Sequence, residues 1–466
     1  MTEPLGPLAG AARRFTAFAE RWMPDAFVFA LVATAIVFAA GLSVGAAPSA
    51  LVDAWGKGFW ELLSFTMQMA LVIITGSVVA SAPPCARFIG WLAARPQSPR
   101  GAVAMVAIFA MLSSWLNWGF SLVFSAVLAR EVARRVRGAD YRALAASSLL
   151  GLGSIWAQGL SGSAALQMAT PGALQPAIRK IVEGPGLVPG GIVSLEHTIF
   201  LWQSLVGVAV EVAIVAIVMW FAVPRGPGVT ARELGIDLGE ARPPEPEPPP
   251  RPGERIERSP ILTALAVALG GAFLVRTFAS GGGLAAITLN TVNLFFLLVG
   301  FALHGTPARL ARAVAGAAPA VAAVILQFPF YAGIAGMITY THLNERIAHL
   351  FVQVSTPATF PAVVAIYSAV LGIFVPSGGS KWVIEAPYVM QAAHELRVHL
   401  GWTVAVYDLG EALANLLQPF WMVPVLGMLG LRARDVMGYT FLVFLALVPV
   451  VLLQVTLFGM TLRYPL

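Results

Sequence analysis

Residues 101–128 read GAVAMVAIFAMLSSWLNWGFSLVFSAVL, an apolar stretch that has basic residues close to both ends. Arg100 directly precedes it, and Arg130 and Arg134 follow it. Short loops rich in Lys and Arg stay on the cytoplasmic side of a membrane, so both ends should lie on that side. The stretch therefore does not cross the membrane. It is predicted to form a re-entrant hairpin of two short helices that turns near Asn117–Ser121, where protein or a wet cavity must surround the irregular backbone.

The composition places the whole chain in a membrane. It has 466 residues, of which 58% are hydrophobic and 11% charged, whereas soluble proteins carry about 25% charge. At about 20 residues per crossing, the length allows roughly ten to twelve membrane segments. The net charge of +6 comes from residues scattered in short loops, which favours membrane orientation over nucleic-acid binding. A single cysteine excludes an internal disulfide, the six histidines form no HExxH pair, and no cofactor or resident metal is expected.

A long polar interruption divides the apolar segments into two sets. It includes PPEPEPPP at 243–250, which is too polar for lipid and too rich in proline for a helix. We predict five parts: an amphipathic N-terminal lead-in, a first membrane repeat, a cytoplasmic linker, an extra connecting helix and a second membrane repeat. They span 1–25, 26–223, 224–259, 260–285 and 286–466, respectively. Basic residues before the first membrane helix predict a cytoplasmic N-terminus, and the recurring apolar segments predict a multi-pass membrane protein.

The second set contains features that match the first set in inverted orientation. The segment 358–393 is predicted to be a second re-entrant hairpin, because Pro376-Ser377-Gly378-Gly379-Ser380 interrupts it. Gln68 lies 49 residues before Asn117, and Gln327 lies 49 residues before Pro376. Broken helices are predicted at 159–163 and 415–419. Inverted repeats with matched discontinuities are typical of secondary transporters. The expected fold is thus an all-α integral membrane protein with two hairpins, two broken helices and about nine to eleven membrane segments.

Polar residues at these interruptions are the candidates for substrate binding. Half-helix N-termini offer unpaired N–H groups to a carboxylate, and glycine allows close approach. The predicted substrate-binding residues are Asn117, Gly119, Ser121, Ser161, Ser163, Gln327, Ser377, Gly378, Gly379, Ser380, Lys381, Asn415 and Gln418. Na⁺ is considered as a ligand near Asn117, Ser377 and Asn415. The competing interpretation is that the interruptions are packing glycines and helix kinks, which are common in membrane bundles.

Several charged residues lie within apolar segments. Glu411 is the main candidate for ion coupling and Asp408 the second, because a carboxylate in a low-dielectric site can carry a proton or hold Na⁺. Lys381 has two interpretations: it is a counter-charge for a substrate carboxylate, or it pairs internally with Glu385 four residues later. No role is assigned to Glu211.

These motifs resemble the bacterial short-chain fatty acid transporters of the acetoacetate and butyrate uptake type, a branch of a wider ion-transporter superfamily. The matching elements occur in order along nearly the whole chain. They are RWMPD at 21–25, WGKGFW at 55–60, FTMQMAL at 65–71, NWGF at 117–120, AREVARRV at 129–136, NTVNL at 290–294, QFPFYAGI at 327–334, VPSGG at 375–379 and QPFW at 418–421.

The resemblance implies uptake of short monocarboxylates across the inner membrane. It also implies a homodimer in which a transport domain that carries the hairpins moves against a scaffold. We therefore expect a secondary-active carrier, not an enzyme, driven by H⁺ or Na⁺, with the bilayer and a short-chain monocarboxylate as partners. The alternative carrier is a dicarboxylate or other organic-anion transporter of the same architecture. A membrane-bound acyltransferase and a channel are the other classes considered. The first needs a His/Asp/Glu or metal site at one membrane face, and the second needs no opposed hairpins.

Overall fold

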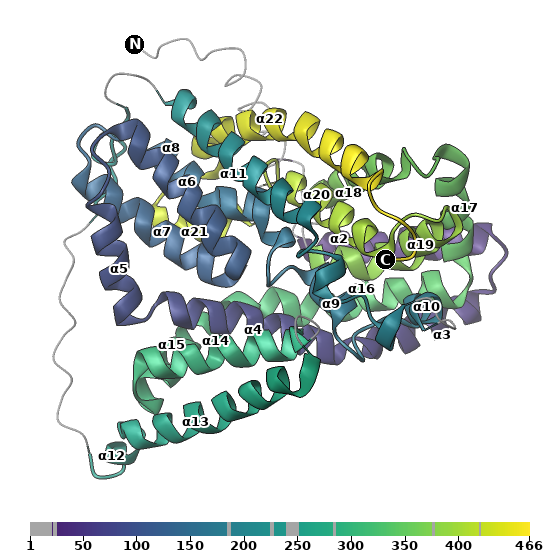
Figure 1. Ribbon diagram of the computed structural model, residues 1–466, viewed down its shortest axis with the longest axis horizontal. Coiled ribbons are helices and arrows are strands. Elements are labelled where there is room, and N and C mark those ends of the chain that lie inside the picture. The colour runs from purple at the N-terminus through teal and green to yellow at the C-terminus, as the bar shows by residue number, and fades with distance from the viewer. Residues whose placement is uncertain are drawn as a thin grey trace.

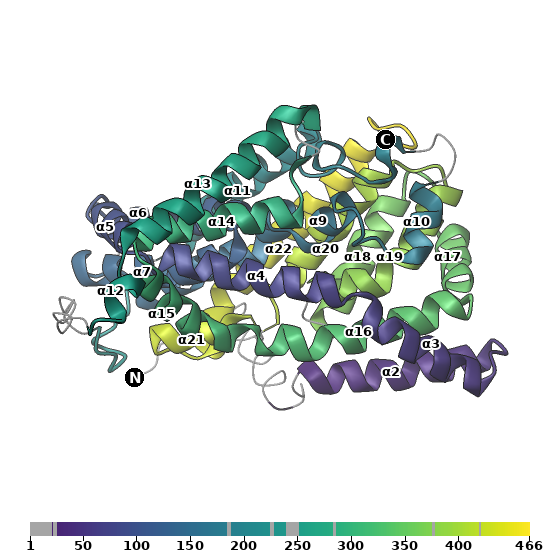
Figure 2. The ribbon, with the colours of Figure 1, turned by 90° about the horizontal axis from the view of Figure 1, so that it is seen from below.

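The computed structural model describes residues 21, 26–183, 188–223, 228–238, 251–282, 286–374, 378–418 and 421–466, and within them all regular secondary structure is helical. The predicted lead-in 1–25, apart from Arg21, and the proline run at 243–250 lie outside the described residues. Figures 1 and 2 show an elongated bundle whose long helices run roughly along its length. The all-α class predicted from the sequence is confirmed.

The helices of the first half, in chain order, are α2 (Ala26–Ser43), α3 (Pro48–Glu61), α4 (Leu63–Ala80), α5 (Pro83–Ala93), α6 (Pro99–Leu116), α7 (Trp118–Arg135), α8 (Tyr141–Leu150), the π-helical η1 (Gly151–Ile155), the 3₁₀ turn η2 (Trp156–Gln158), α9 (Ser163–Ala169), α10 (Pro176–Val182) and α11 (Trp202–Ala222). Those of the second half are α12 (Glu254–Glu257), α13 (Pro260–Thr277), α14 (Leu289–His304), α15 (Pro307–Ala317), α16 (Ala322–Tyr340), α17 (Leu343–Val354), α18 (Phe360–Phe374), α19 (Gly378–Glu395), α20 (Leu400–Ala414), α21 (Met422–Leu429) and α22 (Ala433–Gly459).

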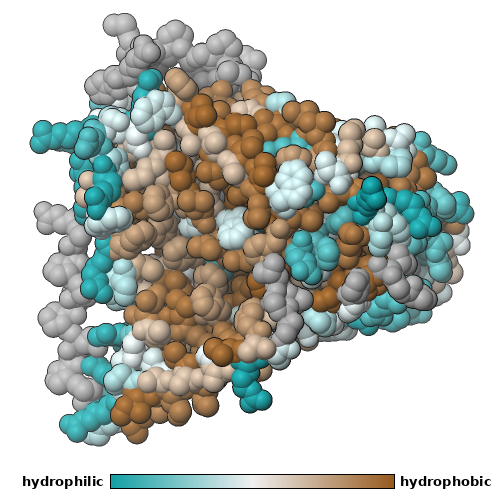
Figure 3. Space-filling view, viewed as in Figure 1, coloured by the Kyte–Doolittle hydropathy of each residue, from teal (hydrophilic) through white to brown (hydrophobic). Residues whose placement is uncertain are grey.

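Six of the helices in the described residues are long and apolar enough to cross a membrane, and a bent pair formed by 307–321 and 324–340 makes a seventh. Three shorter apolar helices accompany them: Ala30–Ser43, Leu289–His304 and Phe360–Ile373. Figure 3 shows a hydrophobic belt between two ends that are richer in hydrophilic residues. The chain is therefore a multi-pass membrane protein, while the total of nine to eleven segments stays a prediction.

The helices differ greatly in how deeply they are buried. The broken helix Tyr141–Ala169 is 94% buried inside the molecule, whereas Pro260–Ser280, which contains α13, is 6% buried. In Figure 1 α13 lies at the periphery beside α14. The broken helix Tyr141–Ala169 thus lies at the centre of the bundle. The outer face of α13 carries exposed apolar side chains such as Leu269 and Phe273, which suit contact with lipid.

Helices α6 and α7 form a hairpin at the place that the sequence indicated. Asn117 has an extended backbone (φ −160°, ψ 119°) that interrupts the helix, and its side chain caps α7 by accepting a hydrogen bond from Phe120 N at 2.8 Å. The two arms fold back on each other, because the Ser121 hydroxyl donates to the carbonyl of Ala110 at 2.9 Å.

Helices α18 and α19 form the second hairpin. Its tip at 375–377 lies outside the described residues, but three contacts join the arms. The Ser368 hydroxyl donates to Glu385 at 2.7 Å, Lys381 Nζ donates to the Ser368 carbonyl at 2.5 Å, and the hydroxyls of Tyr367 and Tyr388 lie 3.0 Å apart.

Both predicted helix breaks are present. The first helix passes from α8 through a π segment and a 3₁₀ turn to Gly159, whose backbone is extended, and resumes at α9. A side chain at Gly159 would clash, since a Cβ atom there would lie 2.2 Å from the carbonyl oxygen of Trp115. The second helix ends at Ala414 and resumes in α21. π segments often occur at functional sites, and this one lies at the first helix break.

The beginning of the predicted linker is attached to the bundle. Asp140 accepts from Val229 N at 3.3 Å, and Tyr141 N donates to Val229 O at 2.8 Å. Arg130 donates to the carbonyls of Leu238 at 3.0 Å and Met428 at 2.9 Å. Residues 228–238 of the linker therefore join α7 and α21.

Candidate substrate site at the hairpins and helix breaks

The first hairpin tip is packed against α4 and against the first helix break. Gly76 on α4 leaves room for the tip, since a Cβ atom there would lie 2.2 Å from Asn117 Oδ1 and 2.4 Å from Phe120 N. The Ser161 hydroxyl accepts a hydrogen bond from Trp118 N at 2.9 Å, at the start of α7. Ser161 thus satisfies one of the N–H groups that a helix start leaves free.

The second hairpin reaches the same break from the other side. A Cβ atom at Gly378 would lie 2.4 Å from the Trp156 ring, and one at Gly379 would lie 3.2 Å from Ser163 Oγ. The Trp156 ring is also 6.3 Å from that of Trp118, centroid to centroid. Trp156 therefore lies between the two hairpins, and glycine at 378 and 379 permits the close approach.

A fully buried charge cluster lies between α19 and α20. Lys381 Nζ is 2.5 Å from Glu411 Oε2 and 3.5 Å from Glu385 Oε1, and all three side chains are 0% exposed. Lys381 Nζ is also 4.7 Å from the centroid of the Tyr407 ring. The structure brings together Lys381 and Glu411, which are predicted from separate segments, and it pairs Lys381 with Glu385 as well.

Asp408 and the second helix break lie at the edge of this cluster. Asp408 is buried and accepts a hydrogen bond from the backbone N–H of Ala165 in α9. Asn415 donates to the Leu152 carbonyl at 3.0 Å, and Gln418 donates to Asn415 Oδ1 at 2.7 Å. The second break thus contacts the π segment of the first one.

The remaining predicted residues have different surroundings. Ser121 bonds within its own hairpin, to Ala110 O and to the Ser113 hydroxyl. Gly119 packs against the backbone of α4, and Gln327 is buried on α16 beside Phe328, whose ring faces Gly379. Ser377 and the side chain of Ser380 lie outside what the structure describes.

The site is closed. Every polar or charged candidate side chain that the structure describes is at most 6% exposed. A cavity of only about 10 Å³ lies beside Asn415, Leu416 and Trp421. A substrate can therefore reach the interruptions only if the packed elements separate.

Several contributors could not be named from the sequence as site residues. Ser368, Glu385 and Tyr407 complete the surroundings of Lys381. Only Glu385 had a signal, its spacing of four residues from Lys381 on one helix. Gln167 on α9 is 0% exposed, and neither of its side-chain polar atoms has a hydrogen-bond partner among the described residues. Glu211 accepts from Gln158 at 3.0 Å at the end of the first break, away from the Lys381 cluster.

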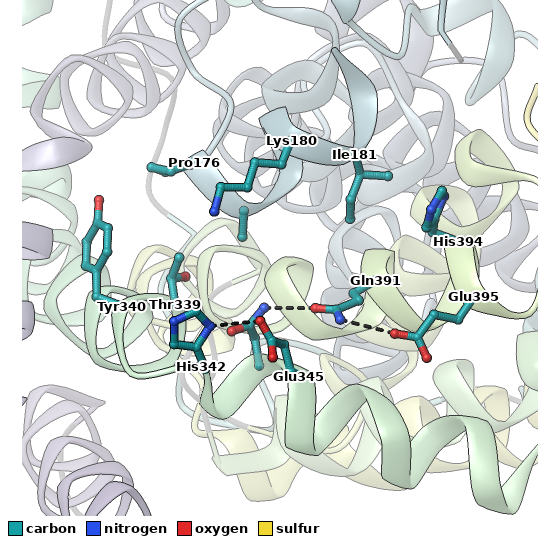
Figure 4. A pocket seen from close by; sticks show the side chains of 12 residues that line it. Pro176, Lys180, Ile181, Thr339, Tyr340, His342, Glu345, Gln391, His394 and Glu395 are labelled. Carbon is teal, nitrogen blue, oxygen red and sulfur yellow. Dashed lines mark hydrogen bonds and ion pairs between the residues drawn. The ribbon is translucent and has the colours of Figure 1, made fainter. Parts of the chain in front are cut away.

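A larger cavity of about 400 Å³ lies elsewhere, between α10, α16, α17 and α19. Figure 4 shows Lys180 above it, with Glu345, Gln391 and Glu395 along its other side. It adjoins the far end of α19, roughly 20 Å from the hairpin tip at 1.5 Å per residue. It is therefore separate from the candidate site.

An apolar helical bundle with two hairpins and two broken helices around buried polar groups defines a multi-pass membrane transporter. Two solved structures share the fold across almost the whole chain. The YdaH transporter of Alcanivorax borkumensis, described as having an unusual topology, matches with a TM-score of 0.56 at 16% identity over 94% of this chain and 98% of that one. MtrF of Neisseria gonorrhoeae, described in connection with antimetabolite efflux pumps, matches with a TM-score of 0.60 at 13% identity over 95% and 97%.

The chain belongs to the short-chain fatty acid transporter family, whose sequence profile matches residues 8–458. A protein of Escherichia coli K12, provisionally named a short-chain fatty acid transporter, is 38% identical over 93% of this chain and 96% of its own length. A protein of Haemophilus influenzae with the same provisional name is 34% identical over 94% and 98%. The predicted family is confirmed, and the protein is a transporter and not an enzyme.

Proposed function

We propose that the protein is a secondary-active carrier of butyrate and acetoacetate-like monocarboxylates across the bacterial inner membrane, coupled to H⁺ or Na⁺. In this proposal 26–223 and 286–466 are inverted repeats and both hairpins are re-entrant. The N-terminus is cytoplasmic, and two copies form a homodimer. The substrate binds between the hairpins, near Trp118 and Trp156.

One observation carries the proposal. Three buried N–H donors, two at the first hairpin tip and one at the first helix break, have no hydrogen-bond partner within the described residues: Asn117 Nδ2, Trp118 Nε1 and Trp156 Nε1. An unpaired buried donor is costly, and a carboxylate oxygen would satisfy it. The N-terminus of the 18-residue helix α7 adds a positive dipole end. Aromatic rings of Trp118, Trp156 and Trp421 supply an apolar wall for a short alkyl chain.

Na⁺ coupling is the alternative to H⁺ coupling within this proposal. The amide oxygens of Asn117 and Asn415 already accept hydrogen bonds from Phe120 N and Gln418. Each of these oxygens keeps a second lone pair, which could bind Na⁺ beside the existing hydrogen bond. Within the described residues, no group of three or more His, Cys, Asp or Glu side chains is arranged to hold a metal ion.

The test is uptake of labelled butyrate into proteoliposomes that contain the purified protein. An inward H⁺ gradient, an inward Na⁺ gradient and no gradient are compared, with succinate as competitor. Empty liposomes are the control, because protonated butyric acid crosses lipid unaided. We expect protein-dependent accumulation driven by one ion and unaffected by succinate. No uptake above empty liposomes by a folded preparation would contradict the proposal, and competition by succinate would favour a dicarboxylate carrier.

Trp156→Phe is expected to weaken butyrate binding while the bundle stays folded. The change removes the unpaired indole N–H and keeps an aromatic ring between the hairpins. A hydrogen bond to a charged group contributes about 1.5–3 kcal/mol, so KM should rise about tenfold or more. Trp91→Phe is the matched control, since Trp91 is 54% exposed on α5. Equal KM values for the two variants would rule out an indole N–H contact with the substrate.

A further inference from the structure

The buried cluster around Lys381 has more negative than positive groups. Lys381 makes the two ion pairs in the described chain in which both side chains are fully buried, with Glu411 and with Glu385. Asp408 lies one turn before Glu411 on α20 and is also buried. One ammonium group thus faces three carboxyl groups in a water-poor interior, where an uncompensated charge costs several kcal/mol.

The contacts indicate that Glu411 is the partner of Lys381 that another carboxylate can replace. Glu385 accepts from the Ser368 hydroxyl at 2.7 Å, and Asp408 accepts from the backbone of Ala165. The hydroxyl of Tyr407 donates to the Gly378 carbonyl, and the Tyr367 and Tyr388 hydroxyls pair with each other. For Glu411, by contrast, the ion pair with Lys381 at 2.5 Å is the polar contact found among the described residues.

The ion pair also lies next to two glycines of the second hairpin, Gly372 on α18 and Gly378 at the start of α19. A Cβ atom at Gly378 would lie 3.1 Å from Glu411 Cγ, and one at Gly372 would lie 2.9 Å from Glu411 Oε2 and 3.5 Å from Lys381 Nζ. The absence of side chains at these two glycines leaves the pair against bare backbone on both arms of the hairpin. A carboxylate that reached Gly378 would therefore come close to the Lys381–Glu411 pair.

We propose that Glu411 holds Lys381 in place of the substrate, and that a substrate carboxylate takes over Lys381 only when Glu411 accepts a proton. This inference rests on the proposed function and specifies its coupling. Adding a further anion to the cluster without a proton would leave it with one more uncompensated charge. Protonation of Glu411 neutralises the carboxylate that the substrate replaces as the partner of Lys381.

The exchange balances in charge and in protons. The empty carrier contains Lys381 as ammonium and Glu411 as carboxylate. The loaded carrier contains Lys381 as ammonium, the substrate as carboxylate and Glu411 as carboxylic acid. One proton enters with each monocarboxylate and the net charge of the cluster is unchanged. Transport should therefore be electroneutral and unaffected by a membrane potential imposed with K⁺ and valinomycin.

The wild-type protein provides the first test. Binding of butyrate to purified protein in weakly buffered detergent solution should take up one proton per butyrate, followed with a pH indicator. The apparent Kd should rise tenfold per pH unit over the range in which Glu411 is ionised, because proton and substrate binding are linked. Binding without proton uptake, with a Kd independent of pH between 5.5 and 8.5, would overturn the inference. No binding at any pH would overturn the proposed function and this inference with it.

Glu411→Gln is the second test. The variant should fold, because Glu385 still provides Lys381 with a buried counter-charge. Lys381 is then always free for the substrate, so butyrate counterflow continues, the Kd loses its pH dependence, and accumulation driven by an H⁺ gradient falls to the level of empty liposomes. Glu211→Gln is the matched control, a buried glutamate on α11 that should retain proton-driven accumulation. Proton-driven accumulation by Glu411→Gln at the wild-type rate would contradict the exchange.

Discussion

Lys381→Gln should both destabilise the protein and reduce transport of butyrate at least about 100-fold. The change leaves Glu411 and Glu385 fully buried without the ammonium that lies 2.5 Å and 3.5 Å from them. Removing one partner of a buried ion pair costs about 3–5 kcal/mol, because the other charge stays behind. The measurements are thermal unfolding in detergent and initial uptake rates in proteoliposomes. The loss of stability should be smaller at low pH, since a protonated carboxyl group needs no counter-charge.

The double variant Lys381→Gln with Glu411→Gln separates the two effects. Replacing both members of a buried pair by neutral groups is often nearly neutral, so most of the lost stability should return. Transport should not return, because no ammonium is left for the substrate carboxylate. Restored stability together with restored transport would show that Lys381 is structural only, which is the internal-pair interpretation of its spacing from Glu385.

Gly76→Ala should have the second largest effect, through the first hairpin tip. A methyl group at this position would lie 2.2 Å from Asn117 Oδ1, 2.4 Å from Phe120 N and 2.9 Å from the Gly119 carbonyl carbon. Two of these neighbours are backbone atoms, so the hairpin tip itself must move. Overpacking of a buried site costs about 1–3 kcal/mol, and loss of the Asn117 cap adds about 1 kcal/mol.

Transport should fall more than stability in the Gly76→Ala variant, because the displaced tip carries the Asn117 amide and the Trp118 indole. The matched control is Gly56→Ala on α3, where an added methyl group has no neighbour within 4 Å. Alanine there should stabilise the helix by about 0.5–1 kcal/mol or leave it unchanged. If Gly76→Ala and Gly56→Ala have the same melting temperature and the same uptake rate, this explanation of Gly76 is wrong.

The sequence predicts the interruptions well because their causes are local. Asn117 caps a helix, glycine at 159 permits an extended backbone, and arginines flank both ends of 101–128. These signals are visible without knowledge of neighbours. The contact between Lys381 and Glu411 could not be predicted, because the two residues lie on different helices, 30 positions apart in sequence, and their contact depends on how α18, α19 and α20 pack.

The direction in which a side chain points could not be predicted from the sequence either. Ser121 follows a predicted tip, yet it faces the other arm of its own hairpin and bonds to Ala110. Trp156 was not among the predicted site residues, because an aromatic residue in an apolar run gives no signal. Its position between the hairpins follows from the π segment and the extended Gly159, which rotate the chain after α8.

The attachment of 228–238 has a mechanical consequence. Arg130 joins α7, the linker and α21 through two carbonyls at the same end of the bundle, as Asp140 does for the turn before α8. The first hairpin tip, at the other end of α7, packs against α4 and is bonded to the first helix break through Trp118 N and Ser161. Because the linker bonds fix this end of the bundle, α7 is expected to move by rotating about it. Opening should thus be widest at the tips and least at Arg130, and a crosslink between 130 and 238 should leave uptake unimpaired.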